Sequence, residues 1–136
     1  MKKPSKIMII DDDPDFVDAI RIILRSAAYD VAWTTSPQSA RQKIVEEEPD
    51  LIMIDVMMDG LFDGIHLCDE IKSSPDLQRF SAVPVILVSA AREFTGSRFE
   101  FYEDQDGQGF KGPDAYLDKP IKPKKLLGTI EALLGR

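Results

Sequence analysis

Short apolar runs alternate along the chain with longer stretches of mixed polarity. Three runs are continuously apolar, at 7–10, 51–54 and 85–88, and two weaker ones lie at 31–34 and 115–117. A short continuous apolar run, bounded by polar or turn-forming residues, is typical of a strand that is buried on both faces. The pattern therefore predicts five strands.

The stretches between these runs carry apolar residues three and four positions apart, the spacing of one helix face. Asp13 and Ser36 each stand directly before a proline, and a capping side chain followed by proline is typical of a helix N-terminus. A further helix is predicted over 64–73. The last one begins near Pro123 and stops at Gly135, because glycine commonly terminates helices.

Strands that alternate with helices indicate a parallel sheet covered on both faces. The strand at 31–34 runs into no chemically active residues, as expected of an edge strand, and the flavodoxin-like strand order 2-1-3-4-5 places it at the edge. We therefore predict a three-layer α/β sandwich with this order and helices on both faces. A length of 136 residues predicts one domain over 1–136.

Charge and cysteine content narrow the classes of function. Seventeen basic and 24 acidic residues give a net charge of −7, whereas nucleic-acid binders normally show a basic surface, so we expect no direct nucleic-acid binding. The single cysteine, Cys68, excludes a disulfide within the chain. No apolar stretch is long enough for a signal peptide or a membrane span, so we expect a cytoplasmic protein without membrane contact.

Acidic residues stand where two of the predicted strands end. Asp11 and Asp12 follow the first strand, and Asp55 follows the third. Parallel sheets of this order bind ligands at the carboxyl ends of the strands, and strands 1 and 3 are neighbours, so the three carboxylates should converge. Close carboxylates raise one another's pKa, and Mg²⁺ with oxygen ligands relieves that repulsion.

Donor groups stand at the ends of the other two strands. The fourth strand runs into Ser89 and Ala90, which offer a hydroxyl and a backbone N–H, and the fifth runs into Lys119. Carboxylates, a divalent metal, a hydroxyl, an amide and an ammonium group together form the inventory of a phosphoryl-transfer site. A carboxylate is itself an established phosphoryl acceptor.

Together, these motifs resemble the receiver domain of bacterial two-component response regulators. The resemblance covers nearly the whole chain, in the expected order and at the expected strand ends. Its motifs are Ile9 to Asp13, Leu51 to Asp55 with Gly60, Asp63 and Gly64, Val85 to Ala90, and Tyr116 to Pro120.

The resemblance implies that Asp55 takes a phosphoryl group from a phosphohistidine of a sensor kinase or of a histidine phosphotransfer protein. Mg²⁺ would be the cofactor, and the surface would switch for a downstream protein. The domain would accept and hydrolyse its own aspartyl phosphate without turning over small molecules. The implied roles are metal binding by Asp11, Asp12, Asp55 and the Met57 backbone carbonyl, phosphoryl contact by Ser89, the Ala90 N–H and Lys119, switching by Ser89 and Tyr116, and a cis peptide bond before Pro120.

The chain departs from the family pattern at two places. Asp59 stands where the family usually has proline, and one extra residue precedes Asp63. Thirty positions separate Ser89 from Lys119, several more than usual. We expect an irregular, aromatic-rich segment at 95–113 that either forms a docking face responsive to Ser89 and Tyr116 or covers the sheet of the domain itself.

Two other functions compete with phosphoryl transfer. A receiver-like domain that only docks partners would lack Mg²⁺ binding, so metal binding discriminates it. A flavodoxin-like cofactor binder is disfavoured, because Asp11, Asp12 and Asp13 would repel a phosphate group. Met57 and Ala91 occupy positions that help to place a hydrolytic water in the family, and neither side chain is suited to that, so we expect a long-lived aspartyl phosphate.

Overall fold

The computed structural model describes residues 3–58, 63–90 and 112–135. Its five strands are all parallel and lie in the order β2-β1-β3-β4-β5, which confirms the predicted fold class. The described elements, with η marking a 3-10 helix, are β1 (Lys6–Ile10), α1 (Pro14–Ser26), β2 (Asp30–Thr34), η1 (Pro37–Ser39), α2 (Ala40–Glu47), β3 (Leu51–Asp55), α3 (Asp63–Ser73), η2 (Pro75–Phe80), β4 (Val85–Ala90), β5 (Ala115–Lys119) and α5 (Pro123–Leu133).

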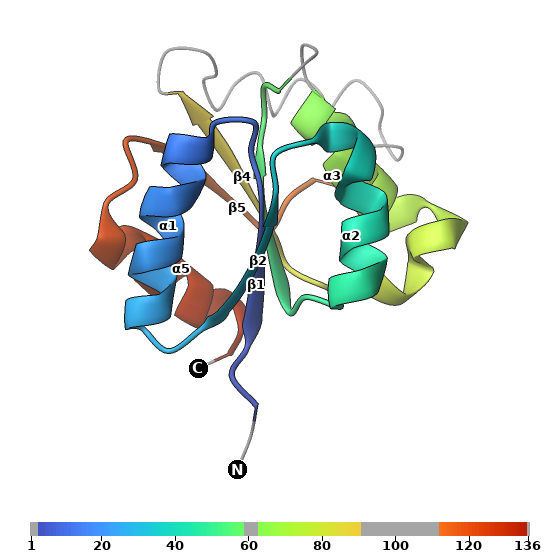
Figure 1. The fold of residues 1–136 in the computed structure, drawn as a ribbon. Coiled ribbons are helices and arrows are strands. Elements are labelled where there is room, and N and C mark those ends of the chain that lie inside the picture. Colours follow the sequence, from blue (N-terminus) through green and yellow to red (C-terminus); the bar gives the residue numbers. More distant parts are fainter. Residues whose placement is uncertain (1–2, 59–62, 91–111, 136) are drawn as a thin grey trace.

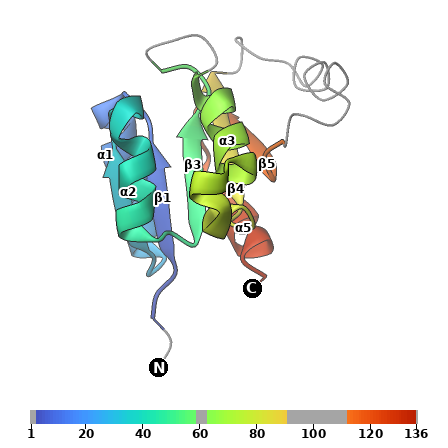
Figure 2. The ribbon, with the colours of Figure 1, turned by 90° about the vertical axis from the view of Figure 1, so that its right-hand side faces the viewer.

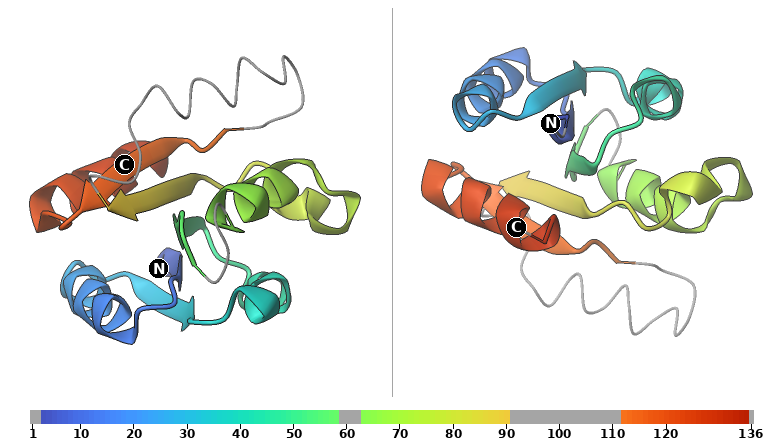
Figure 3. Two further views of the ribbon diagram at one scale, coloured as in Figure 1. Left: turned by 90° about the horizontal axis from the view of Figure 1, so that it is seen from above. Right: turned by 90° about the horizontal axis from the view of Figure 1, so that it is seen from below.

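The sheet stands between two layers of helices. Helices α1 and α5 cover one face, and α2 and α3 cover the other (Figure 1). Figure 2 shows α2 and α3 in front of the sheet, and both views of Figure 3 show the strands between the two layers. The carboxyl ends of all five strands therefore open on one edge of the molecule, where this fold places its ligands.

Alternation along each strand fills two separate cores. In β1, Ile7 and Ile9 face α1 and α5, whereas Met8 and Ile10 face α2 and α3. All four side chains are essentially inaccessible to water. Because successive strand residues point to opposite faces, a continuous apolar run serves both cores, as the sequence pattern predicted.

Both predicted helix starts are present, but only one of them has a side-chain cap. The Asp13 carboxylate accepts hydrogen bonds from the backbone N–H groups of Asp15 and Phe16, as predicted for a cap. Ser36 stands at the predicted N-cap position, with Pro37 as the first residue of η1, but its side chain makes no capping hydrogen bond. Its hydroxyl donates to Gln38 instead, and the short η1 turn precedes α2. Competing local hydrogen bonds of this kind are common for serine.

Several sequence-based expectations fall on residues that the structure does not describe. The aromatic-rich segment predicted at 95–113 lies outside the described residues up to position 111, and so does Ala91. The altered loop at 59–62 also lies outside them. Among the helices that are described, none has the length and apolar character needed to cross a membrane.

Candidate functional site

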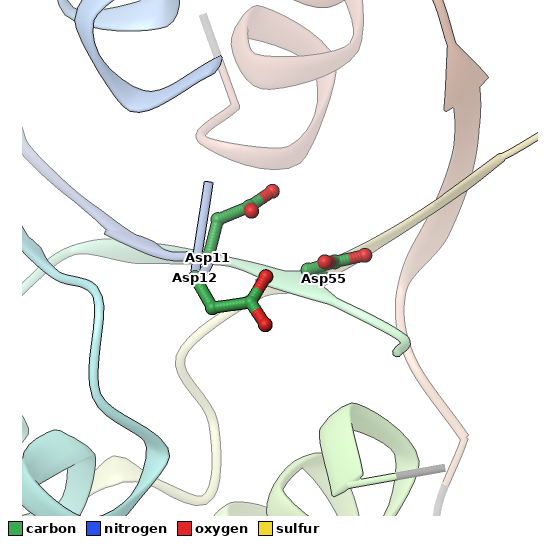
Figure 4. Close-up of side chains that lie close together, drawn as sticks. All are labelled: Asp11, Asp12 and Asp55. Atoms are coloured by element: carbon green, nitrogen blue, oxygen red, sulfur yellow. The ribbon is translucent and has the colours of Figure 1, made fainter. Parts of the chain in front are cut away.

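Three carboxylates meet where β1 and β3 end. The two strands are paired with Ile10 opposite Ile54, so the next residues, Asp11 and Asp55, are brought side by side. One carboxylate oxygen from each of Asp11, Asp12 and Asp55 lies within 4.8 Å of the other two. Figure 4 shows the three side chains gathered at this point. The predicted convergence is thus present in the fold.

Burial differs sharply among the three aspartates. Asp11 is only 1% exposed and Asp55 only 7%, whereas Asp12 is exposed. The Oδ1 atom of Asp11 accepts a hydrogen bond from the Asp13 backbone N–H at 2.9 Å. Its Oδ2 atom is buried and has no hydrogen-bond partner in the described part of the chain. Buried polar atoms are normally hydrogen-bonded, so this oxygen, which is ion-paired with Lys119 at 3.2 Å, still has lone pairs to offer to a ligand.

Lys119 is the cation closest to these carboxylates among the described residues. Its Nζ atom lies 3.2 Å from Asp11 Oδ2 and 3.8 Å from Asp55 Oδ2. The contact with Asp11 Oδ2 is an ion pair whose geometry is not that of a hydrogen bond. Lys119 is the last residue of β5 and pairs with Ala90 at the end of β4. The sequence predicted this lysine from its place at a strand end. The peptide bond from Lys119 to Pro120 is cis.

Both buried carboxylates are held back from ionising. Burial, and next to it the charge of Asp11, raises the pKa of Asp55 from 3.8 to about 7, although Lys119 and the Met57 backbone N–H act in the opposite direction. Burial also raises the pKa of Asp11, against the Asp13 N–H and Lys119. One lysine does not compensate the two negative charges, and a second cation in the pocket would favour the ionised forms.

Gly64 brings α3 directly against the end of β3. A Cβ atom at this position would lie 2.0 Å from the Asp55 carbonyl oxygen and 2.8 Å from Val56 Cα. The Gly64 backbone N–H donates to the Val56 carbonyl at 3.0 Å. Only glycine permits such a close approach of two backbones. The sequence marked Gly64 as part of a motif, but the contact that requires glycine is visible only in the fold.

The remaining predicted side chains lie on the neighbouring strands β4 and β5 or directly after β3. Ser89 is buried at the end of β4, and its hydroxyl donates to Asp118 at 3.5 Å. Tyr116 lies on β5 and is 40% exposed. Met57 is partly buried and packs against the core beneath α2 and α3.

One neighbour of the site escaped the sequence analysis. The ring of Phe16, which looked like an ordinary apolar position of the first helix, has its centroid 4.3 Å from Lys119 Nζ. Helical spacing places Phe16 on the inner face of α1 but carries no information about its distance from β5. Only the packing of α1 beside the end of β5 reveals the contact.

Comparison with known proteins agrees with this geometry. The model of the response regulator receiver domain family matches residues 7–131. The DNA-binding dual master transcriptional regulator RpaA of Synechocystis sp. PCC 6803 is 34% identical over 96% of this chain and 49% of its own length. The phosphate regulon transcriptional regulatory protein PhoB of Pseudomonas aeruginosa is 31% identical over 96% of this chain and 52% of its own.

Solved structures share the fold over nearly the full chain. A candidate response regulator from Chloroflexus aurantiacus J-10-fl superposes with a TM-score of 0.79 at 28% identity, covering 98% of this chain and 100% of that one. A CheY-like receiver domain protein from Methanospirillum hungatei gives 0.77 at 23% identity over 97% and 94%, and supports the fold alone.

The comparisons correct one expectation. The chain spans about half the length of the curated relatives it matches, and RpaA and MtrA of Mycobacterium tuberculosis are both named as DNA-binding. The exclusion of direct nucleic-acid binding, which rested on the net charge of −7, is contradicted by these relatives. The basic residues that neutralise DNA phosphates can lie on a separate domain, so the charge of one segment does not decide the matter.

Proposed function

The chain belongs to the response regulator receiver domain family of two-component systems, and from this premise we propose that Asp55 accepts a phosphoryl group from a phosphohistidine in the presence of Mg²⁺. The observation that carries this assignment is the cluster of Asp11, Asp12 and Asp55 beside Lys119. Receiver domains are not, in general, enzymes acting on small molecules.

The donor set suits Mg²⁺. It consists only of oxygens, and the buried Asp11 Oδ2 atom has no hydrogen-bond partner in the described part of the chain. Mg²⁺ prefers such oxygen ligands and usually keeps several waters. We assign Asp11, Asp12, Asp55 and the Met57 backbone carbonyl as its protein ligands. When bound, the metal would neutralise negative charge on the carboxylates and on the phosphoryl oxygens.

The transfer exchanges one bond for another. An oxygen of the Asp55 carboxylate attacks the phosphorus atom of the phosphohistidine in line. A P–O bond forms as the P–N bond breaks, and its electron pair returns to the histidine, which leaves as a neutral imidazole because its other ring nitrogen already carries a proton. Lys119 faces the phosphoryl oxygens as negative charge develops on them, and its position beside Asp55 is set before the reaction.

The switch would follow from new acceptors in the pocket. The phosphoryl oxygens would accept hydrogen bonds from the Ser89 hydroxyl and the Ala90 backbone N–H. Ser89 would then leave Asp118, its partner in the resting state. Tyr116, now 40% exposed, would turn inward beside Ser89 and change the outer surface of β5.

The single experiment that tests phosphorylation is incubation with a small acyl phosphate, with and without Mg²⁺, followed by intact-protein mass. Asp55→Asn should lose the added phosphoryl mass entirely. Asp13→Asn is the matched control, because an asparagine carbonyl still caps α1 and Asp13 is not among the proposed ligands. Undiminished labelling of Asp55→Asn contradicts the assignment. A folded wild-type protein that neither binds Mg²⁺ nor takes up phosphate supports the docking-only function instead.

We also propose that the aspartyl phosphate hydrolyses slowly, because the Met57 side chain is poorly suited to orient an attacking water. Met57→Asn should shorten the lifetime of the labelled protein several-fold, measured as the decay of phosphorylated mass after the donor is removed. Met58→Asn serves as the control, since Met58 is also partly buried but is not placed at the metal. Equal lifetimes for the wild type and Met57→Asn contradict this expectation.

A further inference from the structure

The Lys119 ammonium has two kinds of neighbour. It lies 3.2 Å and 3.8 Å from carboxylate oxygens of Asp11 and Asp55, and it lies 4.3 Å from the centroid of the Phe16 ring. The face of an aromatic ring carries partial negative charge and attracts a cation at this range. Lys119 is 25% exposed, so water weakens this attraction only in part.

The Phe16 ring is fixed independently of the lysine. The backbone N–H of Phe16 donates to the Asp13 carboxylate at 3.4 Å, as part of the cap at the N-terminus of α1. The next residue of α1, Val17, is buried in the core between the sheet and helices α1 and α5, and the partly buried Phe16 packs against that core as well. The ring is therefore held by the fold of α1 and offers a stable surface to the flexible lysine side chain.

The carboxylates beside Lys119 are the groups that the proposed function engages. The Asp11 carboxylate would coordinate the metal, and phosphoryl transfer would convert Asp55 into an acyl phosphate. Both events change the negatively charged partners of the ammonium group, because the metal would share Asp11 and the phosphoryl oxygens would replace the Asp55 carboxylate. The Phe16 ring takes part in neither event, so its attraction for Lys119 persists throughout.

We propose that Phe16 is a positioning residue, whose ring keeps the Lys119 ammonium beside Asp55 while Asp11 and Asp55 change partners. The inference rests on the proposed function and deepens it. Lysine carries a compact charge on a long, flexible stem, so a fixed ring face beside the ammonium group restricts where that charge can lie.

The test compares four variants of the whole chain. Phe16→Leu keeps an apolar side chain but removes the ring, and Phe16→Tyr and Phe16→Trp keep an aromatic face. Trp33→Leu is the matched control, because it removes another cation–ring contact, that of Arg21 at 3.7 Å, on the edge strand β2. Trp33 is 37% exposed and is not among the residues assigned to the site.

Three measurements are made on each variant: the NMR shifts of the Lys119 ε-protons, the Mg²⁺ affinity, and the phosphorylation rate by a small acyl phosphate at saturating Mg²⁺. Phe16→Leu should remove the ring-current shift of Lys119 and slow phosphorylation by about three- to tenfold. Mg²⁺ affinity should stay equal or become tighter, because the lysine competes with the metal for Asp11. The aromatic variants should restore the rate, and Trp33→Leu should match the wild type.

The inference is overturned if Phe16→Leu leaves the Lys119 shift and the rate unchanged, or if all three Phe16 variants lose rate equally, which indicates packing alone. Weaker Mg²⁺ binding by Phe16→Leu also overturns it, because that result means a distorted pocket. A wild-type protein that takes up no phosphate refutes the proposed function instead, and the Lys119 shift and the Mg²⁺ affinity then decide the inference.

Discussion

Asp55 combines two demands that oppose each other. A nucleophile must be ionised, yet burial and the neighbouring Asp11 raise its pKa from 3.8 to about 7. A raised pKa in the folded state means that folding favours the protonated form. The contribution of protonated Asp55 to the free energy of unfolding is therefore complete below pH about 4 and is lost as the pH rises through about 7. Without a second cation in the pocket, the ionised Asp55 carboxylate therefore destabilises the folded protein near and above pH 7, where Asp55 would act as the nucleophile.

Asp55→Asn should therefore stabilise the metal-free protein at pH 8, because the amide stays neutral in the buried site. The full shift corresponds to about 4 kcal/mol, and we expect a gain of about 1–3 kcal/mol in the free energy of unfolding, measured by denaturant titration. The gain should shrink toward zero near pH 4. Asp76→Asn, an exposed substitution in η2, is the control. A gain that is independent of pH contradicts the electrostatic origin.

At the scale of elements, the site depends on how closely α3 approaches β3. The backbone of Gly64 lies against the end of the strand that carries Asp55, and its N–H donates to the Val56 carbonyl. The start of α3 and the end of β3 are thus joined through main-chain atoms, which cannot adjust as a side chain can. Any side chain at Gly64 must move either the helix or the strand end.

Gly64→Ala should lower the free energy of unfolding by about 1–3 kcal/mol and slow phosphorylation of Asp55, because its Cβ atom has no space. Gly128→Ala, within α5, offers the same substitution in open space, where nothing lies within 4 Å. Alanine is the better helix former, so this control should raise the free energy of unfolding by about 1 kcal/mol. Thermal unfolding of both variants checks the opposite signs. Stabilisation by Gly64→Ala would refute the close approach.

At the scale of the whole molecule, most of the architecture could be predicted from the sequence. Continuous apolar runs are typical of strands in doubly covered sheets, so the strands followed from the pattern, and their order followed from the flavodoxin-like arrangement that places the strand at 31–34 at the edge. The convergence of Asp11, Asp12 and Asp55 followed from that order. Contacts between side chains that are distant in the sequence could not be predicted, because the spacing of residues along one helix or strand does not show which residues of the neighbouring element they touch. Phe16 beside Lys119 is such a contact.

The features that the sequence did not predict have different physical origins. Ser36 stands at a helix N-cap as predicted, but its hydroxyl points to Gln38 rather than to a backbone N–H, and the chain begins there with the 3-10 helix η1. The 3-10 helix η2 carries the buried Leu77 and Phe80, but its six residues are too few to show a periodic pattern. Net charge excluded nucleic-acid binding wrongly, because an average over one segment does not describe the proteins to which such segments belong.

Lys119 supplies the pocket with a counter-ion that is built into the chain. Its ammonium group lies 3.2 Å from an oxygen of Asp11 and 3.8 Å from an oxygen of Asp55, so part of the positive charge that these carboxylates need comes from β5 itself. Because this charge is covalently attached to the sheet, it cannot diffuse away, and it offsets the repulsion between the two buried carboxylates. Lys119 belongs to neither hydrophobic core, so the charge of the pocket can be altered at this residue while both cores stay as they are.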